Sequence, residues 1–218
     1  MSGTSRRGWL VAALLVASVP AAAADLWVAV PLYNNGFEDW DGGLPAGWGR
    51  EPWIRPEDCT EPGAILSADD AAAGQTALLL QGGPRSCRFD AVLQELPAEP
   101  GQVYRLRARL RSVDVDSTGR RFTNANAFLA SGDAGNRTFA HALTPFLAGT
   151  NDWAEQTTSL ALTPGVTRLK VGAFLSVPGR LYVDDMRLER LTPPAPAIDA
   201  PRARRDVRPA SRALSRAV

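Results

Sequence analysis

The segment from Gln102 to Ser112 alternates between apolar and arginine side chains, a pattern with a period of two. A β-strand sends successive side chains to opposite faces, so the pattern predicts a strand with one buried face and one polar face. The expected inward side chains are Tyr104, Leu106, Ala108 and Leu110, and the outward ones are Arg105, Arg107, Arg109 and Arg111.

A similar alternation from 167 to 177 predicts a second strand, with Leu169, Val171, Ala173 and Leu175 facing inward. Proline and glycine turns separate further short candidates, and no long segment has a helical period. Short strands broken by turn signals predict an all-β fold, a β-sandwich of two antiparallel sheets. Short helical turns are expected near residues 67–73. The further strand candidates are residues 77–81, 88–96, 123–131, 156–161 and 181–191.

The two ends of the chain differ from its centre. Residues 1–24 carry Arg6-Arg7, an apolar run and a stretch of alanines, which is typical of a cleaved secretory signal. The pattern predicts a secreted or periplasmic bacterial protein. Residues 5–10 also resemble a twin-arginine export signal, so both export routes stay open. Residues 192–218 are rich in proline, alanine and arginine and are expected to be a disordered tail able to touch anionic surfaces.

The predicted core, residues 25–191, has the size of one domain. It holds 16 basic and 21 acidic residues, whereas the tail is cationic. An acidic core argues against nucleic-acid binding. No later segment is apolar over enough residues to cross a bilayer. The expected partners therefore include no nucleic acid, and no transmembrane segment is expected.

The chain has two cysteines, Cys59 and Cys87. In an oxidising compartment they are expected to form a disulfide. By chain entropy, closing a loop of roughly 28 residues contributes about 3–4 kcal/mol. Two buried free thiols are the alternative.

Motifs of common enzymes are absent from the sequence. It has no G-x-S-x-G elbow, no glycine-rich phosphate loop and no H-E-x-x-H, and His141 is the single histidine. A glycosidase needs two carboxylates facing one cleft, and no recognisable acid/base motif is present. The chain is therefore expected not to be an enzyme.

Three regions, in this order, are similar to motifs of secreted carbohydrate-binding modules with the galactose-binding-like jelly roll, the group of families 4, 9, 16 and 22. The opening resembles N-x-G-F-E followed by P-x-G-W, the centre resembles S-G-x-x-A-L-x-L with a later P-G-x-x-Y-x-L, and the end resembles G-x-x-Y-x-D-D-V-x-L. The resemblance implies a jelly-roll β-sandwich and sugar binding without catalysis. The matching stretches are residues 34–38, 44–48, 73–80, 93–96, 100–106, 152–153, 162–164 and 179–188.

The resemblance also implies a structural calcium ion. Glu38 and Asp184 match the family's carboxylate ligands, and Asn35 and Gln75 lie where carbonyl oxygens would complete the shell. Calcium takes six to eight oxygen ligands, so this mixture suits the ion. Alternatively, Glu38 and Asp184 only cap turns.

The sugar site is harder to predict, because the family's stripe of aromatic side chains is missing from the central strands. Trp48 and Trp153 match core positions of the family, and Trp27 is expected to pack against the first strand. Sugars stack on aromatic rings while polar groups hold their hydroxyls. The candidate ligand-binding residues are Trp40, Trp53, Gln94, Arg107, Arg109 and Asn126.

If the arginine face is the concave sheet surface, Gln94 and either Asn124 or Asn126 are expected to lie beside it. Several guanidinium groups in a row favour an acidic glycan, whereas nearby Asp and Glu would make the same row an ordinary solvated face. The main hypothesis is a secreted module that binds a poly- or oligosaccharide. The rivals are a structural or surface-associated jelly roll without sugar binding and a polysaccharide-acting enzyme.

Overall fold

The computed structural model describes residues 26–54, 61–83, 86–118, 123–133, 135 and 137–192. The side chains of residues 52–54, 61–62 and 86–90 are not described. The predicted signal, the tail from residue 193 onward and Cys59 therefore lie outside the described residues. So does the Cys87 side chain, and the predicted disulfide stays a prediction.

The described residues form strands joined by turns and loops, with no helix among them. The strands are β1 (Leu26–Val30), β2 (Trp40–Asp41), β3 (Leu44–Pro45), β4 (Gly49–Ile54), β5 (Glu61–Pro62), β6 (Ala64–Ala68), β7 (Ala77–Gly82), β8 (Ser86–Pro97), β9 (Val103–Val115), β10 (Ala125–Gly132), β11 (Thr138–Leu143), β12 (Gly149–Ala161), β13 (Arg168–Leu175) and β14 (Gly179–Thr192). The helical turns expected near 67–73 are wrong, because β6 runs to Ala68 and bends follow it.

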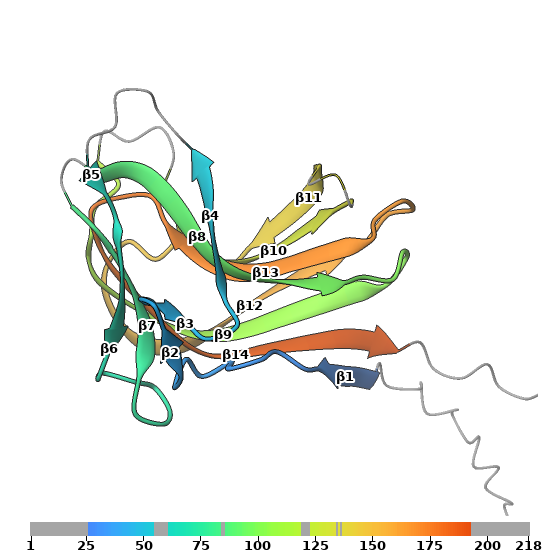
Figure 1. Ribbon diagram of the computed structural model, residues 1–218, viewed down its shortest axis with the longest axis horizontal. Coiled ribbons are helices and arrows are strands. Elements are labelled where there is room, and N and C mark those ends of the chain that lie inside the picture. The colour runs from blue at the N-terminus through green and yellow to red at the C-terminus, as the bar shows by residue number, and fades with distance from the viewer. Residues whose placement is uncertain are drawn as a thin grey trace, which may run out of the picture. The chain divides into compact units, whose positions relative to one another are not determined.

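Two sheets pack face to face (Figure 1). We call sheet I the sheet with strand order β12-β9-β14-β7-β6, in which β1 also pairs with β14. Sheet II has the order β11-β10-β13-β8-β4, with β5 pairing with β8. Apart from the short parallel pair β5–β8, the pairings within both sheets are antiparallel, which confirms the predicted all-β jelly-roll sandwich.

The alternation on β9 is confirmed. Tyr104, Leu106, Ala108 and Leu110 are buried in the core between the sheets, and their arginine neighbours lie on the outer face of sheet I. By contrast, β13 is buried at every residue from Leu169 to Leu175, so its face away from the core, which carries Gly172 and Phe174, is covered as well. Sheet II is therefore apolar on both faces at its centre, where Phe128 and Phe174 belong to a second apolar cluster.

Two of the three tryptophans assigned to packing roles lie as expected. Trp48 is buried and its ring centroid lies 4.9 Å from that of Phe37. Trp27 packs beneath the Arg105 guanidinium, 4.0 Å from the ring centroid. The core position of Trp153 is wrong, because its ring meets Tyr182 and Asp70 on the outer face of sheet I. Within the described residues, no helix is long and apolar enough to span a membrane.

Candidate functional site

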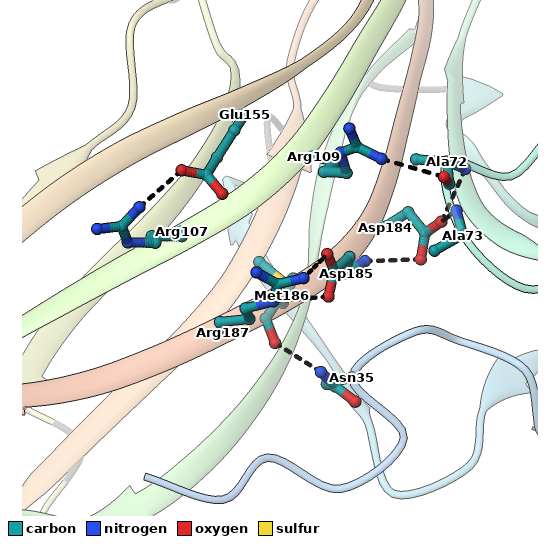
Figure 2. Close-up of polar contacts among 10 residues, drawn as sticks. All are labelled: Asn35, Ala72, Ala73, Arg107, Arg109, Glu155, Asp184, Asp185, Met186 and Arg187. Carbon is teal, nitrogen blue, oxygen red and sulfur yellow. Dashed lines mark hydrogen bonds and ion pairs between the residues drawn. The ribbon is translucent and has the colours of Figure 1, made fainter. Parts of the chain in front are cut away.

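The arginine row on β9 is largely neutralised by carboxylates of the same face. Glu189 Oε2 lies 2.6 Å from Arg105 Nε and 3.2 Å from Arg107 Nε. Arg107 also reaches Glu155 on β12 at 2.8 Å, as Figure 2 shows. The Arg105 hydrogen bond lowers the pKa of Glu189, and the bonds to Glu155 and Glu189 raise that of Arg107. Of the two alternatives, a site for an acidic glycan and an ordinary solvated face, these ion pairs favour the solvated face.

The six predicted ligand-binding residues do not gather on one surface. Arg107 and Arg109 lie on sheet I, whereas Gln94 and Asn126 lie on β8 and β10 of sheet II. The expectation that the amides lie beside the arginines is wrong, because β8 and β10 belong to the opposite layer of the sandwich. The side chain of Trp53 on β4 lies outside the described residues.

The two amide side chains are buried and already hydrogen-bonded. Gln94 donates from Nε2 to the Tyr33 carbonyl and accepts the Tyr33 amide at 3.2 Å. Asn126 donates from Nδ2 to the Thr144 carbonyl at 2.6 Å and accepts the Ala125 amide. Both residues therefore position backbone in the interior, and the structure corrects their assignment as surface ligands.

Trp40 is not a free platform either. Its ring packs against the main core, and Nε1 donates to the Phe37 carbonyl at 2.8 Å. The ring instead fixes the loop that carries Glu38. A sequence pattern cannot separate an anchoring tryptophan from a platform, because both are aromatic residues in polar loops.

The predicted metal ligands do come together, around the loop between β6 and β7. Asp184 is fully buried and accepts the Ala72 and Ala73 amides at 2.8 Å on one oxygen, as Figure 2 shows. Glu38 accepts the Gln75 amide at 2.9 Å and the Thr76 amide at 3.2 Å. Both carboxylates thus hold the same loop, one from each end of the folded core.

Asn35 connects this cluster to a bulge in β14. Its Nδ2 donates to the Met186 carbonyl at 3.1 Å, as Figure 2 shows. The Asn35 backbone carbonyl accepts the Met186 amide at 2.9 Å. Asp185 has a φ of 46°, so the strand kinks between Asp184 and Met186. The bulge aims Asp184 at the loop and not along the regular face.

Glu38 and Asp184 offer the hard oxygen ligands that calcium binds. Both carboxylates also accept backbone amides, as turn-capping residues do, and burial raises the pKa of Asp184. Within the described residues, no group of three or more His, Cys, Asp or Glu side chains could hold a metal ion. Gln75 does not fit as predicted, because the Gln75 backbone turns its N–H, and not a carbonyl, toward Glu38.

The outer face of sheet II carries a row of polar side chains that the sequence did not indicate. Register places His141 beside Ala130, Ala130 beside Lys170 and Lys170 beside Glu95, so the row crosses four strands on one face. Lys170 Nζ lies 2.7 Å from Glu51 of β4, and Arg168 pairs with Glu95. We call the polar residues of this face the polar row: His141, Lys170, Arg168, Glu95 and Glu51.

The polar row borders the second apolar cluster. Phe128 and Phe174 meet edge to face with centroids 5.6 Å apart, and Ala91, Leu93 and Ala130 surround them. Phe139 of β11 exposes 44% of its surface and lies where the register of β10 and β11 shifts. A cavity of about 470 Å³ opens where β8 ends and β13 begins, lined by Glu95, Leu96, Pro97, Thr167 and Arg168. The apolar cluster itself is buried, so the polar row and its paired charges supply the accessible groups of this face.

Comparison with known proteins identifies the fold. No family model and no curated protein matches the chain. Among solved structures, the Stig cyclase Fisc from Fischerella sp. TAU superposes with a TM-score of 0.52 at 16% identity, covering 76% of this chain and 98% of that one. The enzymatically active domain of tailspike protein 4 from bacteriophage CBA120 gives 0.52 at 13% identity, covering 72% of this chain and 21% of that one.

Carbohydrate-binding modules are also among the structural neighbours. The CBM22-1 xylan-binding domain of Paenibacillus barcinonensis Xyn10C has a TM-score of 0.47 and 14% identity, covering 80% of this chain and 100% of that one. At identities this low, the two structures with a TM-score of 0.52 show the fold and not the ligand. Jelly-roll carbohydrate-binding modules, the predicted kind of relative, are thus found among the solved structures that the chain resembles.

Proposed function

We propose that this chain binds a poly- or oligosaccharide at the outer face of sheet II, without catalysis. The observation that carries the proposal is the polar row, with Phe139 exposed on β11 and a cavity next to Glu95 and Arg168. A sugar offers an apolar ring face and a rim of hydroxyls, which the Phe139 ring and the polar row would meet. His141, Lys170 and Arg168 would donate hydrogen bonds, and Glu51 and Glu95 would accept them.

The ligand we propose is a neutral glycan. The paired arginines of sheet I and the pairs Lys170–Glu51 and Arg168–Glu95 leave little net positive charge to attract a uronate. Paired charges still donate and accept hydrogen bonds to hydroxyl groups. Binding of a neutral sugar to such a surface should depend only weakly on salt, because few counterions are displaced.

A direct test is native affinity electrophoresis of the full chain in gels containing xylan, galactan, β-glucan or polygalacturonate. Retardation in a neutral glycan that Phe139→Ala and His141→Ala each reduce supports the proposal. The matched control is Ser159→Ala, an exposed position on β12 of sheet I. Absence of retardation in every glycan would overturn the proposal, and retardation only in polygalacturonate would overturn the neutral ligand.

The second candidate is a structural jelly roll that binds no sugar. The low exposure of Phe128 (0%) and Phe174 (5%) favours this candidate, because these rings present no open stacking surface. An enzyme is the third candidate, since two of the structural neighbours are enzymes by name. Release of soluble sugars from the same glycans would identify that activity.

We also propose a structural calcium ion held by Glu38, Asp184 and the Asn35 side-chain oxygen. The ion would supply positive charge to the buried carboxylate and join the first loop of the core to its last strand. Burial of Asp184 and its exclusively backbone hydrogen bonds from the described residues support this part of the proposal.

A further inference from the structure

A second aromatic and polar cluster lies on sheet I, in the layer opposite the proposed binding face. Trp153 of β12 meets Tyr182 of β14 with centroids 6.3 Å apart and an interplanar angle of 72°. Trp153 Nε1 lies 3.5 Å from Asp70, and Asp70 pairs with Arg111 of β9. Four segments that are distant in sequence thus bring an indole, a carboxylate and a guanidinium to one place.

Trp153 differs from the other aromatic rings of this face. The Arg105 guanidinium covers the Trp27 ring. The Arg111 guanidinium lies over the Tyr182 ring, and Tyr182 is buried. Within the described residues, no cation lies over the Trp153 ring, and the ring is half-buried. Trp153 is therefore the indole of this face that still has ring surface to offer.

Asp70 keeps part of its hydrogen-bonding capacity toward solvent, although each of its oxygens has one partner. Its side chain is 52% exposed, and that of Arg111 is 27% exposed. A carboxylate with two oxygens can accept hydroxyl hydrogens while one of its oxygens stays paired with Arg111. The exposed guanidinium N–H groups of Arg111 supply donors for hydroxyl oxygens.

The loop that carries Asp70 is held in place before any ligand arrives. Arg109 donates to the Ala72 carbonyl at 3.1 Å, and Asp184 accepts the amides of Ala72 and Ala73, as Figure 2 shows. A rigid site loses less conformational entropy on binding than a mobile one. Asp70 is therefore positioned beside Trp153 by contacts that a ligand does not have to create.

We propose that Trp153, Asp70 and Arg111 form a second saccharide site, which takes one neutral sugar ring. The indole would stack on the apolar face of the ring, Asp70 would accept hydroxyl hydrogens and Arg111 would donate to hydroxyl oxygens. The Asp70–Arg111 pair has no net charge, which disfavours a uronate. Because sheets I and II are the two layers of the sandwich, sites on both outer faces would let one molecule join two glycan chains.

The experiment uses the full chain in the same affinity gels with xylan, galactan and β-glucan. The variants are Trp153→Ala, Asp70→Asn and the sheet II double variant Phe139→Ala/His141→Ala. Trp153→Ala and Asp70→Asn are also each combined with that double variant. Ser159→Ala on the same strand as Trp153 is the control. Circular dichroism and thermal melting of each variant verify its folding, and Asp70→Asn alters the charge while keeping the side-chain shape.

The expected result is partial binding in the sheet II double variant, which Trp153→Ala or Asp70→Asn then weakens by about tenfold or more. Complete loss of binding in the double variant, with Trp153→Ala and Asp70→Asn still binding like wild type, would overturn the second site and leave the first. Loss of all binding in folded Trp153→Ala, with the double variant unaffected, would support the second site and overturn the sheet II proposal. Absence of binding by wild-type protein in every gel would overturn both.

Discussion

The carboxylate of Glu189 lies 2.6 Å from Nε of Arg105, across the pairing of β14 and β9. Glu189 and Arg105 are direct partners in that pairing, and the same oxygen reaches Arg107 at 3.2 Å. Trp27 lies on the other side of the Arg105 guanidinium, so the pair also connects the outer face of sheet I to β1. The contact makes stability depend on pH.

Stability should fall on acidification through Glu189. Its pKa is lowered in the folded state, chiefly by the Arg105 hydrogen bond, so the unfolded chain binds the proton more readily. The contribution is complete above the ordinary glutamate pKa of about 4.3 and is lost as pH falls through the folded-state value. For a partly exposed pair we expect about 1 kcal/mol or less.

Urea titrations at pH 7 and at pH 3 measure this effect. Glu189→Gln should lose less stability than wild type between the two pH values. Glu99→Gln is the control, because Glu99 is an exposed residue that pairs with Arg190. Equal pH dependence in wild type and Glu189→Gln would refute the assignment.

Gly74→Ala should destabilise the fold by about 2–3 kcal/mol, since a positive φ costs a non-glycine residue about 1–2 kcal/mol and lost hydrogen bonds add to this. Gly74 has a φ of 71°, and a Cβ there would overlap the Glu38 carboxylate that holds the loop. The matched control is Gly101→Ala, where φ is 78° but a Cβ meets open space. Equilibrium urea unfolding measures the free energy of unfolding of both variants. Equal losses of stability would show that the Glu38 contact contributes nothing.

Calcium should raise the thermal midpoint of the wild-type chain, because a ligand that binds only the native state stabilises it. The comparison is melting in excess calcium and in EDTA, with Asp184→Asn as the variant that removes a proposed ligand charge. A midpoint that is the same in both solutions would contradict the ion. Magnesium in place of calcium controls for general ionic effects, since it prefers smaller octahedral sites.

The Cys59–Cys87 disulfide should leave no reactive thiol in unfolded, unreduced protein. Its reduction should lower the free energy of unfolding by about 3 kcal/mol, as expected for a loop of roughly 28 residues. A thiol titration in denaturant gives the answer, and two free thiols per chain would disprove the bond. The double variant Cys59→Ser/Cys87→Ser, which lacks any thiol, provides the baseline.

Several features of the fold could be predicted because their cause is local. The alternation on β9 determined which side chains enter the core, since the strand period is fixed by backbone geometry. The meeting of Glu38 and Asp184 at one loop was implied by the resemblance to jelly-roll carbohydrate-binding modules, and no local pattern predicted it. The β13 pattern predicted only half of the burial, because a period of two does not reveal what covers the other face.

The sequence by itself determined the fold class and the inward face of β9, and its resemblance to a family implied that Glu38 and Asp184 are neighbours. Only the tertiary structure decided that Gln94 and Asn126 lie in the opposite layer from Arg107, and that His141, Lys170 and Glu95 share a row. It also placed Trp153 beside Asp70, across 83 residues of chain. The physical reason is that side-chain alternation is a local property, whereas strand order and register arise from the packing of the whole sandwich.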